Sequence, residues 1–397
     1  MNALEWRSTI SLGSVYALRM VGMFMILPVF ALYARSLPGQ VTPLQEGFTL
    51  GLYGLVQAFL QIPFGIASDR WGRKPVIVVG MLLFALGSFI AGSTHDIYWI
   101  MLGRAVQGAG AVSAAVSALV ADTTRAEVRT TAMAILGAGM GVSFILAMVL
   151  GPVFEGWIGV NGIFDMTGVL ALLSIPLVLF VVPNAPPAEK RVANMEAAIH
   201  DTQLLRLDGG VFLLHLLMAG LFQAAPYAIL QTLGLPVEKH WQVYLPVLII
   251  SIVPVFPLIR WAEKRGHTKP VFLGAVVTLG VALLLAAAGH TVAAGLWTAM
   301  LVFFVAFNYL EGSLPSMISR RAPASQKGAA LGVFSTAQVL GGAIGAPLGG
   351  YLYQHGGLGL AFAGPALLTA LWLSFAAGQT PPPDAVHAAA EPSRPSV

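Results

Sequence analysis

The sequence contains no cysteine, and only 10% of its residues are charged. The absence of cysteine excludes disulfides and Cys-ligated metal sites, and the eight histidines show neither His-x-x-x-His nor His-Glu-x-x-His spacing. Soluble globular domains usually carry about 25% charged residues. We therefore expect no metal and no cofactor, and we expect the bilayer, instead of water, to surround most of the chain.

Apolar residues make up 57% of the chain, which has a mean hydropathy of +0.80. A helix needs about 20 consecutive apolar residues to cross a bilayer. The apolar runs are long and rich in Leu, Ala, Met and Gly, and they lack the alternation of a membrane barrel. The sequence therefore predicts an all-α membrane protein with twelve transmembrane helices. The predicted spans are 8–34, 47–68, 75–94, 97–121, 130–155, 162–183, 209–233, 241–261, 270–289, 291–318, 328–352 and 358–378.

The positive charges predict the orientation of these spans. Of the 21 Lys and Arg residues, 17 fall in the termini and in the loops on the same side, whereas only Arg35 and Lys239 fall in loops on the other side. The positive-inside rule assigns the richer side to the cytoplasm. We expect a multi-pass protein of the bacterial inner (plasma) membrane with both termini cytoplasmic. The net charge of +4 then reflects topology, and no nucleic-acid partner is expected.

A long polar interruption divides the spans into two sets of six. Residues 184–208 begin with a Pro-rich break and continue as a predicted amphipathic helix, so we expect a cytoplasmic linker there. The expected N-terminal bundle is 1–183 and the expected C-terminal bundle is 209–378. Residues 379–397 contain five prolines and are predicted to be a disordered cytoplasmic tail. Residues 69–76 align weakly with 263–271, which indicates two pseudo-symmetric halves.

The loop after the second span carries the pattern Gly-x-x-x-Asp-Arg-x-Gly-Arg-Lys over residues 65–74. It resembles the signature loop of the major facilitator superfamily, and every fixed position is filled. The resemblance implies that Arg73 pairs with Asp122 and that Asp69 faces the start of helix 11 near residues 327–330, where the helix dipole favours an anion. Ordinary topogenic charges would not explain the Gly and Asp spacing. The implied conformational latch consists of Gly65, Asp69, Arg70, Gly72, Arg73, Lys74 and Asp122.

Away from the span ends, four charged or histidine residues lie inside predicted spans: Arg19, Arg104, His215 and Glu311. An arginine at the centre of a span costs at least about 2.5 kcal/mol, so such residues are functional candidates. The family resemblance places all four on the helices that line a central cavity. The alternatives are arginines bound to backbone carbonyls, a static buried ion pair and a histidine at the membrane interface. The predicted set for proton coupling or substrate binding is Arg19, Arg104, Gln107, His215, Asn308 and Glu311.

Two further motifs resemble those of drug/proton antiporters. Arg104 and Gln107 stand in an Arg-x-x-Gln-Gly pattern on the fourth span, and residues 151–156 resemble the Gly-Pro-x-x-Gly-Gly ending of the fifth, although Ala147 occupies an expected glycine position. We predict that Gly151, Pro152 and Gly156 form a helix-packing motif. Over nearly the whole membrane portion, the chain resembles the YajR-type bacterial drug/proton antiporters, without their soluble C-terminal domain.

We therefore predict a monomeric, proton-coupled secondary transporter that exports small amphipathic compounds by alternating access. Its expected partners are a small-molecule substrate, protons and the lipid bilayer. One alternative is an uncoupled or differently coupled carrier of a metabolite or lipid, in which Arg19 and Arg104 bind an anionic headgroup. Another is a membrane sensor that does not transport. An enzyme is not expected, because no span-facing Ser/His/Asp set or His/carboxylate metal cluster emerges.

Overall fold

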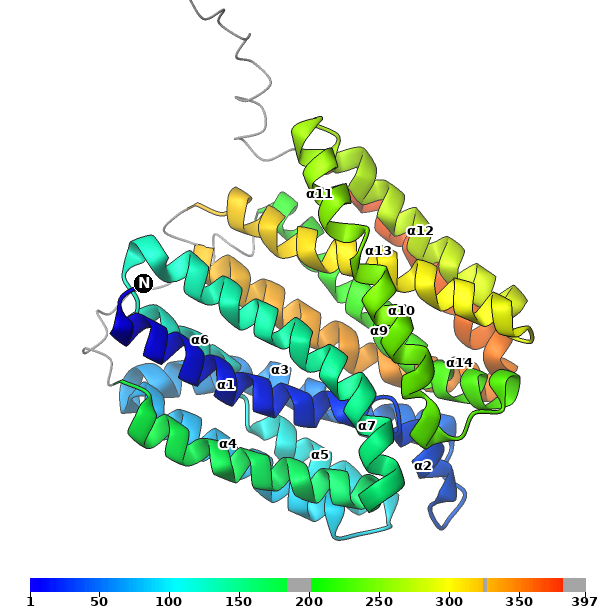
Figure 1. Ribbon diagram of the computed structural model, residues 1–397, viewed down its shortest axis with the longest axis horizontal. Helices are drawn as coiled ribbons and strands as arrows, with labels where there is room; N and C mark the ends of the chain where they lie inside the picture. Colours follow the sequence, from blue (N-terminus) through cyan, green and yellow to red (C-terminus); the bar gives the residue numbers. More distant parts are fainter. Residues whose placement is uncertain (184–200, 324–326, 381–397) are drawn as a thin grey trace, which may run out of the picture.

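The computed structural model describes residues 1–183, 201–323 and 327–380, and every regular element in these ranges is helical (Figure 1). Local sequence explains several helix starts. Thr42 and Gln45 form a capping box at the start of α3, and Asp201 caps α9.

The helices of the first half are α1 (Ala3–Met25), α2 (Phe30–Ser36), α3 (Pro43–Trp71), α4 (Arg73–Gly92), α5 (Ile97–Ala109), α6 (Ser113–Asp122), α7 (Ala126–Pro176) and the π-helical turn η1 (Leu177–Val181). Those of the second half are α9 (Thr202–Leu233), the short η2 (Val237–Lys239), α10 (Trp241–Ile252), α11 (Val255–Lys264), α12 (Thr268–Gly289), α13 (Ala293–Arg321) and α14 (Lys327–Ala376).

Two helices, α7 and α14, are 51 and 50 residues long, which is more than twice the length of one crossing. Each contains a glycine with non-helical backbone angles: Gly159 has φ 67° and Gly357 has φ 61°. Both values lie in the left-handed region that favours glycine. Each long helix is therefore a pair of antiparallel spans joined by a tight turn.

Within the described ranges, ten helices or bent helix pairs are long and apolar enough to cross a membrane. One of them is the pair α1 and α2, which meet at 48°. Dividing α7 and α14 at their glycines raises the count to twelve. This confirms the predicted all-α fold of two six-helix halves.

The two halves meet along α14, which packs against α9 of its own half and against α3 of the other. In Figure 1 most helices of the first half lie in the lower part of the view and α9–α13 lie above them. One large apolar core spans both halves, from Met25 and Phe30 to Phe304 and Trp372. A second apolar core lies within the first half.

The bundle has two ends, which we name by their connections. The loop end carries residues 69–74 and 122–129, and the far end carries residues 36–42 and 234–240. At the far end, a Cβ atom on Gly47 or Gly51 of α3 would overlap backbone carbonyl oxygens of α14. A Cβ on Gly350 of α14 would likewise overlap the carbonyl oxygen of Pro43. These glycines allow the two halves to approach closely at the far end.

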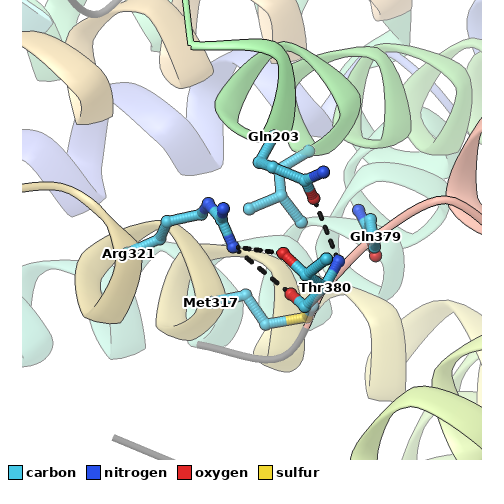
Figure 2. Close-up of a pocket in the computed structure, with 6 residues that line it drawn as sticks. Gln203, Met317, Arg321, Gln379 and Thr380 are labelled. Carbon is cyan, nitrogen blue, oxygen red and sulfur yellow. Dashed lines mark hydrogen bonds between the residues drawn. The ribbon is translucent and has the colours of Figure 1, made fainter. Parts of the chain in front are cut away.

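Two boundaries differ from the sequence analysis. The predicted linker includes residues 202–208, but these form the first turns of α9, and residues 184–200 lie outside the described residues. The tail was predicted to begin at Gln379, yet Gln379 is only 4% exposed. Figure 2 shows the adjacent Thr380 bound to Arg321 of α13 and Gln203 of α9, by hydrogen bonds of 3.0 Å to each side chain. The rest of the predicted tail, 381–397, lies outside the described residues.

Candidate functional site

Arg73 is the centre of the signature loop. Its Nε donates to Asp122 Oδ2 at the end of α6 over 2.9 Å, and its Nη1 donates to Ser68 Oγ over 2.7 Å. The same guanidinium forms an ion pair with Asp69, one turn before it. Gly72 separates α3 from α4 with φ 93°, a value that a residue with a side chain rarely adopts. The loop thus joins α3, α4 and α6 through one cation and two carboxylates.

In this conformation Asp69 forms its ion pair within its own half. Its side chain is 62% exposed and pairs with Arg73, and no hydrogen bond joins it to α14 within the described part of the chain. The reason is that the close contacts between the halves lie at the far end, so Asp69 is left to pair within its own half. Lys74 also bonds within that half, since its Nζ donates to the carbonyl oxygen of Val182 over 2.6 Å. Gly65 has room for a Cβ, and Arg70 is exposed.

A second ion pair at the loop end lies close to the latch. Arg125, between α6 and α7, binds Glu5 of α1 with 2.7 Å between Nε and Oε1. Hydrogen bonding to this carboxylate raises the pKa of Arg125. The loop end of the first half is therefore held together by charges on α1, α3, α4 and α6.

Two buried arginines of the first half meet at one tyrosine. Arg19 of α1 donates from Nη2 to the hydroxyl oxygen of Tyr53 over 2.7 Å, and the Arg104 guanidinium lies over the Tyr53 ring, 4.6 Å from its centroid. Arg104 also donates to Gln107 Oε1 over 2.8 Å, and Gln107 donates to Ser88. Arg19 and Arg104 are each only 2% exposed. The structure thus brings these two predicted residues together inside the first half.

In the described part of the chain, these two guanidinium groups have no anionic partner. No carboxylate lies within 4.0 Å of either group among the residues that the structure describes, and the Nε atom of each has no hydrogen-bond partner there. Neutral oxygens and aromatic rings surround them instead. Burying a cation without an anionic partner costs free energy. These two arginines are therefore candidates for binding an anionic group that comes from outside the protein.

The other predicted ionisable pair meets in the second half. Glu311 of α13 and His215 of α9 both contact Gln338 of α14, whose Nε2 lies 3.1 Å from Glu311 Oε1 and 2.8 Å from His215 Nε2. His215 Nδ1 lies 3.2 Å from the carbonyl oxygen of Val211, which can only accept a hydrogen bond. With a proton on Nδ1, His215 can donate to Val211, and Gln338 Nε2 can then donate both to His215 Nε2 and to the Glu311 carboxylate.

The exposure of Glu311 distinguishes it from the arginines. Its side chain is 34% exposed, whereas that of His215 is 11% exposed. Glu311 nevertheless lies within a membrane-crossing helix, 18 residues after the start of α13. No hydrogen bond or ion pair of the described residues joins Glu311 and His215 to Arg19 and Arg104, so the four residues form two clusters and not one. Asn308 belongs to neither, because its Nδ2 donates to Ser251 of α10 over 2.9 Å.

The predicted packing glycines serve two different contacts. A Cβ on Gly151 would overlap the carbonyl oxygen of Met25, so this glycine brings α7 close to α1 within the first half. A Cβ on Gly156 would lie 2.8 Å from the Cβ of Glu238, which belongs to η2 in the second half. Pro152 lies inside α7 between them.

Sequence reasoning missed a cluster at the far end. Glu46 of α3 is completely buried, and it contacts Tyr227 and Gln223 of α9. The predicted span begins at residue 47, so it leaves Glu46 outside. The capping box at Thr42 and Gln45 was the missed signal, because it starts the helix at Pro43 and so puts Glu46 within it.

Comparisons with known proteins agree with this fold. The model of the Major Facilitator Superfamily matches residues 12–338 and 210–397. The chain is 43% identical to the inner membrane transport protein YajR of Escherichia coli (strain K12), over 96% of this chain and 84% of that protein. It is 26% identical to the multidrug resistance protein MdtH of Photorhabdus laumondii subsp. laumondii, over 85% of this chain and 84% of that protein.

Two solved structures share the fold at low sequence identity. A bacterial homologue of the human lysosomal transporter Spinster, in an inward-facing and occupied conformation, has a TM-score of 0.77 at 13% identity, over 95% of this chain and 97% of that one. The human organic anion transporter MFSD10 has a TM-score of 0.69 at 18% identity, over 94% of this chain and 100% of that one. The chain therefore belongs to the major facilitator superfamily and is a membrane transporter, not an enzyme.

Proposed function

We propose that this transporter is proton-coupled and exports small amphipathic compounds by alternating access. The observation that carries the proposal is Glu311, a partly exposed carboxylate within a membrane-crossing helix, bound by Gln338 and close to His215. Ionisable residues at such depth are expensive and mark ion or substrate pathways. The similarity to YajR and to MdtH, which is named for multidrug resistance, supports export as the direction.

The proposed coupling uses two states of Glu311. When it is ionised, Glu311 accepts a hydrogen bond from Gln338 and can bind a cationic or polar group of the substrate. When it takes up a proton, its charge is neutralised and the substrate is released. Competition between proton and substrate for one carboxylate is the simplest arrangement that makes their transport reciprocal.

The orientation and the latch belong to the same proposal. The distribution of Lys and Arg supports cytoplasmic termini, so the loop end faces the cytoplasm and the far end faces outside. The described conformation then has its halves joined at the outer side. Alternating access requires the opposite arrangement as well, in which the far end opens and Asp69 exchanges its partner Arg73 for the start of α14. We also propose that the protein works as a monomer and that its first half ends at residue 183, before the linker.

A second candidate function is favoured by the two arginines. Arg19 and Arg104 are buried cations without a carboxylate partner in the described residues, and an anionic substrate would supply the missing charge. In that case the protein would carry an anionic metabolite or lipid and need not move protons.

The decisive experiment compares proton release by two variants. Everted membrane vesicles with an established pH gradient are supplied with lipophilic cations or neutral drugs while a pH-gradient dye is recorded. Glu311→Gln removes the proposed proton site. Glu263→Gln is the matched control, because Glu263 also lies in the second half but pairs with Arg320 at the loop end, where it is 45% exposed.

We expect substrate addition to dissipate the gradient with wild type and with Glu263→Gln, and not with Glu311→Gln. Gradient dissipation by Glu311→Gln equal to that of wild type would contradict the role of Glu311. Transport of an anionic compound that is insensitive to an uncoupler, yet lost in Arg104→Ala, would favour the second candidate.

A further inference from the structure

The two halves are joined by hydrogen bonds at one place. In the described ranges, the three hydrogen bonds that cross between the halves are Tyr227 to Ala31, Tyr227 to Glu46 and Gln223 to Glu46. All of them lie at the far end. We call Arg35, Glu46, Gln223, Tyr227 and Tyr353 the far-end cluster. Because Glu46 belongs to the first half and both of its hydrogen-bond partners to the second, this cluster must break whenever the far end opens.

The hydrogen bonds of Tyr227 require one proton more than an ionised Glu46 provides. The Tyr227 hydroxyl oxygen lies 2.7 Å from the carbonyl oxygen of Ala31 and 2.7 Å from Glu46 Oε2. A hydroxyl has a single hydrogen to donate, and a backbone carbonyl can only accept. Both contacts are therefore hydrogen bonds only if Tyr227 donates to Ala31 and the Glu46 carboxyl group carries a proton and donates it to Tyr227.

The surroundings of Glu46 also disfavour a negative charge. Among the residues that the structure describes, its one cationic neighbour is Arg35 of α2, whose Nε is 3.7 Å from Oε1, beyond hydrogen-bond distance. Arg35 is 43% exposed, and its guanidinium lies over the rings of Tyr227 and Tyr353, at 4.1 and 5.2 Å. Glu46 Oε1 has no hydrogen-bond partner among the described residues. A completely buried carboxylate with so little compensation is costly, whereas a neutral carboxylic acid is not.

We infer that Glu46 is a proton-binding site that closes the far end of the transporter. In the closed far end the Glu46 carboxylic acid donates to Tyr227, which donates to Ala31, while Gln223 donates to Glu46. When the halves separate at this end, Glu46 loses Tyr227 and Gln223, meets water beside Arg35 and releases its proton there. Closing takes up one proton from the same side. This site is distinct from Glu311 and rests on alternating access, but not on proton coupling at Glu311.

The sign of the pH effect follows from this proton balance. The closed far end holds one more proton than the open far end, so low pH on the outer side favours closure and rising pH favours opening. Within the described residues, the charged and titratable groups around Glu46 are Arg35 from α2, Tyr227 from α9 and Tyr353 from α14. Closure by an ionised Glu46 that accepts hydrogen bonds from Tyr227 and Gln223 would predict the reverse, since those bonds would weaken when Glu46 takes up a proton.

The absence of cysteine makes a direct test possible. Gly156 and Glu238 are both exposed at the far end, in opposite halves, and a Cβ on Gly156 would lie 2.8 Å from that of Glu238. Cysteines at both positions can form a disulfide only while the far end is closed, after a small adjustment of these surface residues. The initial rate of disulfide formation with an added oxidant is measured by counting the thiols that remain for a maleimide-polyethylene glycol.

The double-cysteine protein is compared with the same protein carrying Glu46→Gln, Tyr227→Phe or Glu263→Gln. The glutamine amide can donate to Tyr227 as the acid does, so Glu46→Gln should stay closed at every pH. Dividing the wild-type rate by the Glu46→Gln rate at the same pH cancels the effect of pH on the thiols. We expect this ratio to fall by up to about tenfold per pH unit above the pH at which opening begins, as one proton per closure requires. Tyr227→Phe should slow the reaction at low pH, and Glu263→Gln should behave as wild type.

Two results would overturn the inference. One is a ratio that does not change between about pH 6 and pH 9, which would mean that closure binds no proton. The other is a Glu46→Gln protein that forms the disulfide much more slowly than wild type at low pH, as closure by an ionised Glu46 predicts. The measurement needs no substrate and no Glu311, so it can fail or succeed independently of the proton-release experiment.

Discussion

Replacing Gly47 by alanine should shift the protein away from the conformation that the structure describes. A Cβ at this position would overlap the carbonyl oxygen of Ala346 and lie 2.7 Å from the Cα of Pro347. Both neighbours are backbone atoms of α14, which cannot move aside as a flexible side chain would. Forcing an extra carbon into a packed contact typically costs about 1–3 kcal/mol.

The cost falls on one conformation only, because Gly47 and Ala346 belong to different halves. When the far end opens, α3 and α14 separate there and the added methyl group meets open space. A penalty of about 1–3 kcal/mol then lowers the ratio of closed to open far ends by about 5- to 150-fold. The disulfide rate of the Gly156→Cys, Glu238→Cys protein reports this ratio directly, at a fixed pH and oxidant concentration.

Two glycines of α14 provide matched controls. A Cβ on Gly342 would have no neighbour within 4 Å, so Gly342→Ala should leave the disulfide rate unchanged. A Cβ on Gly345 would overlap the carbonyl oxygen of Leu216, which lies in the same half. Gly345→Ala should therefore lower the melting temperature without changing the disulfide rate. A Gly47→Ala protein whose disulfide rate equals that of Gly342→Ala would refute the reasoning.

Three further predictions concern the other clusters. Asp69→Asn should impair transport in vesicles that contain normal amounts of inserted protein, and normal transport would remove the latch hypothesis. Gln338→Leu should reduce substrate-triggered proton release by about tenfold, because loss of a hydrogen bond to a charged group costs about 1.5 kcal/mol or more; release at the wild-type rate would separate Gln338 from Glu311. Tyr53→Phe removes an acceptor of the buried Arg19 and should lower unfolding stability by about 1–3 kcal/mol in a thermal melt, whereas an unchanged melt would show that Arg19 finds another acceptor.

The sequence was sufficient for the architecture because the bilayer imposes strong local rules. Apolar runs, alternate-side positive charge and the break after residue 183 are all readable without tertiary contacts. The sequence also predicts the short loops inside α7 and α14, where the structure has only a tight turn at one glycine or a glycine pair. The errors lie at helix ends, where polar residues such as those at 202–208 continue a helix beyond its apolar part.

The clusters were only partly predictable, because they depend on which helices pack together. Rarity identified Arg19, Arg104, His215 and Glu311 as the ionisable residues within spans, but it did not reveal that they form two separate clusters. Their partners Tyr53 and Gln338 are of residue types that occur throughout the spans, so nothing in their local sequence distinguishes them.

The positions of the ionic contacts imply how the two ends differ. At the loop end, Arg73 is bonded within its own half, to Asp69 and Asp122, so none of the latch ion pairs seen in the described residues has to break for the halves to separate there. At the far end, the buried contacts of Glu46 join the two halves and are lost on opening. When the far end opens and the loop end closes, new contacts between the halves at the loop end therefore have to replace those of Glu46. Asp69, exposed and held by only one cation in the described residues, is the group free to make them at least cost. In the proposed mechanism, opening of one end is coupled to closing of the other through groups that change partners between the halves, so we expect Tyr227→Phe and Asp69→Asn to shift the conformational equilibrium in opposite directions.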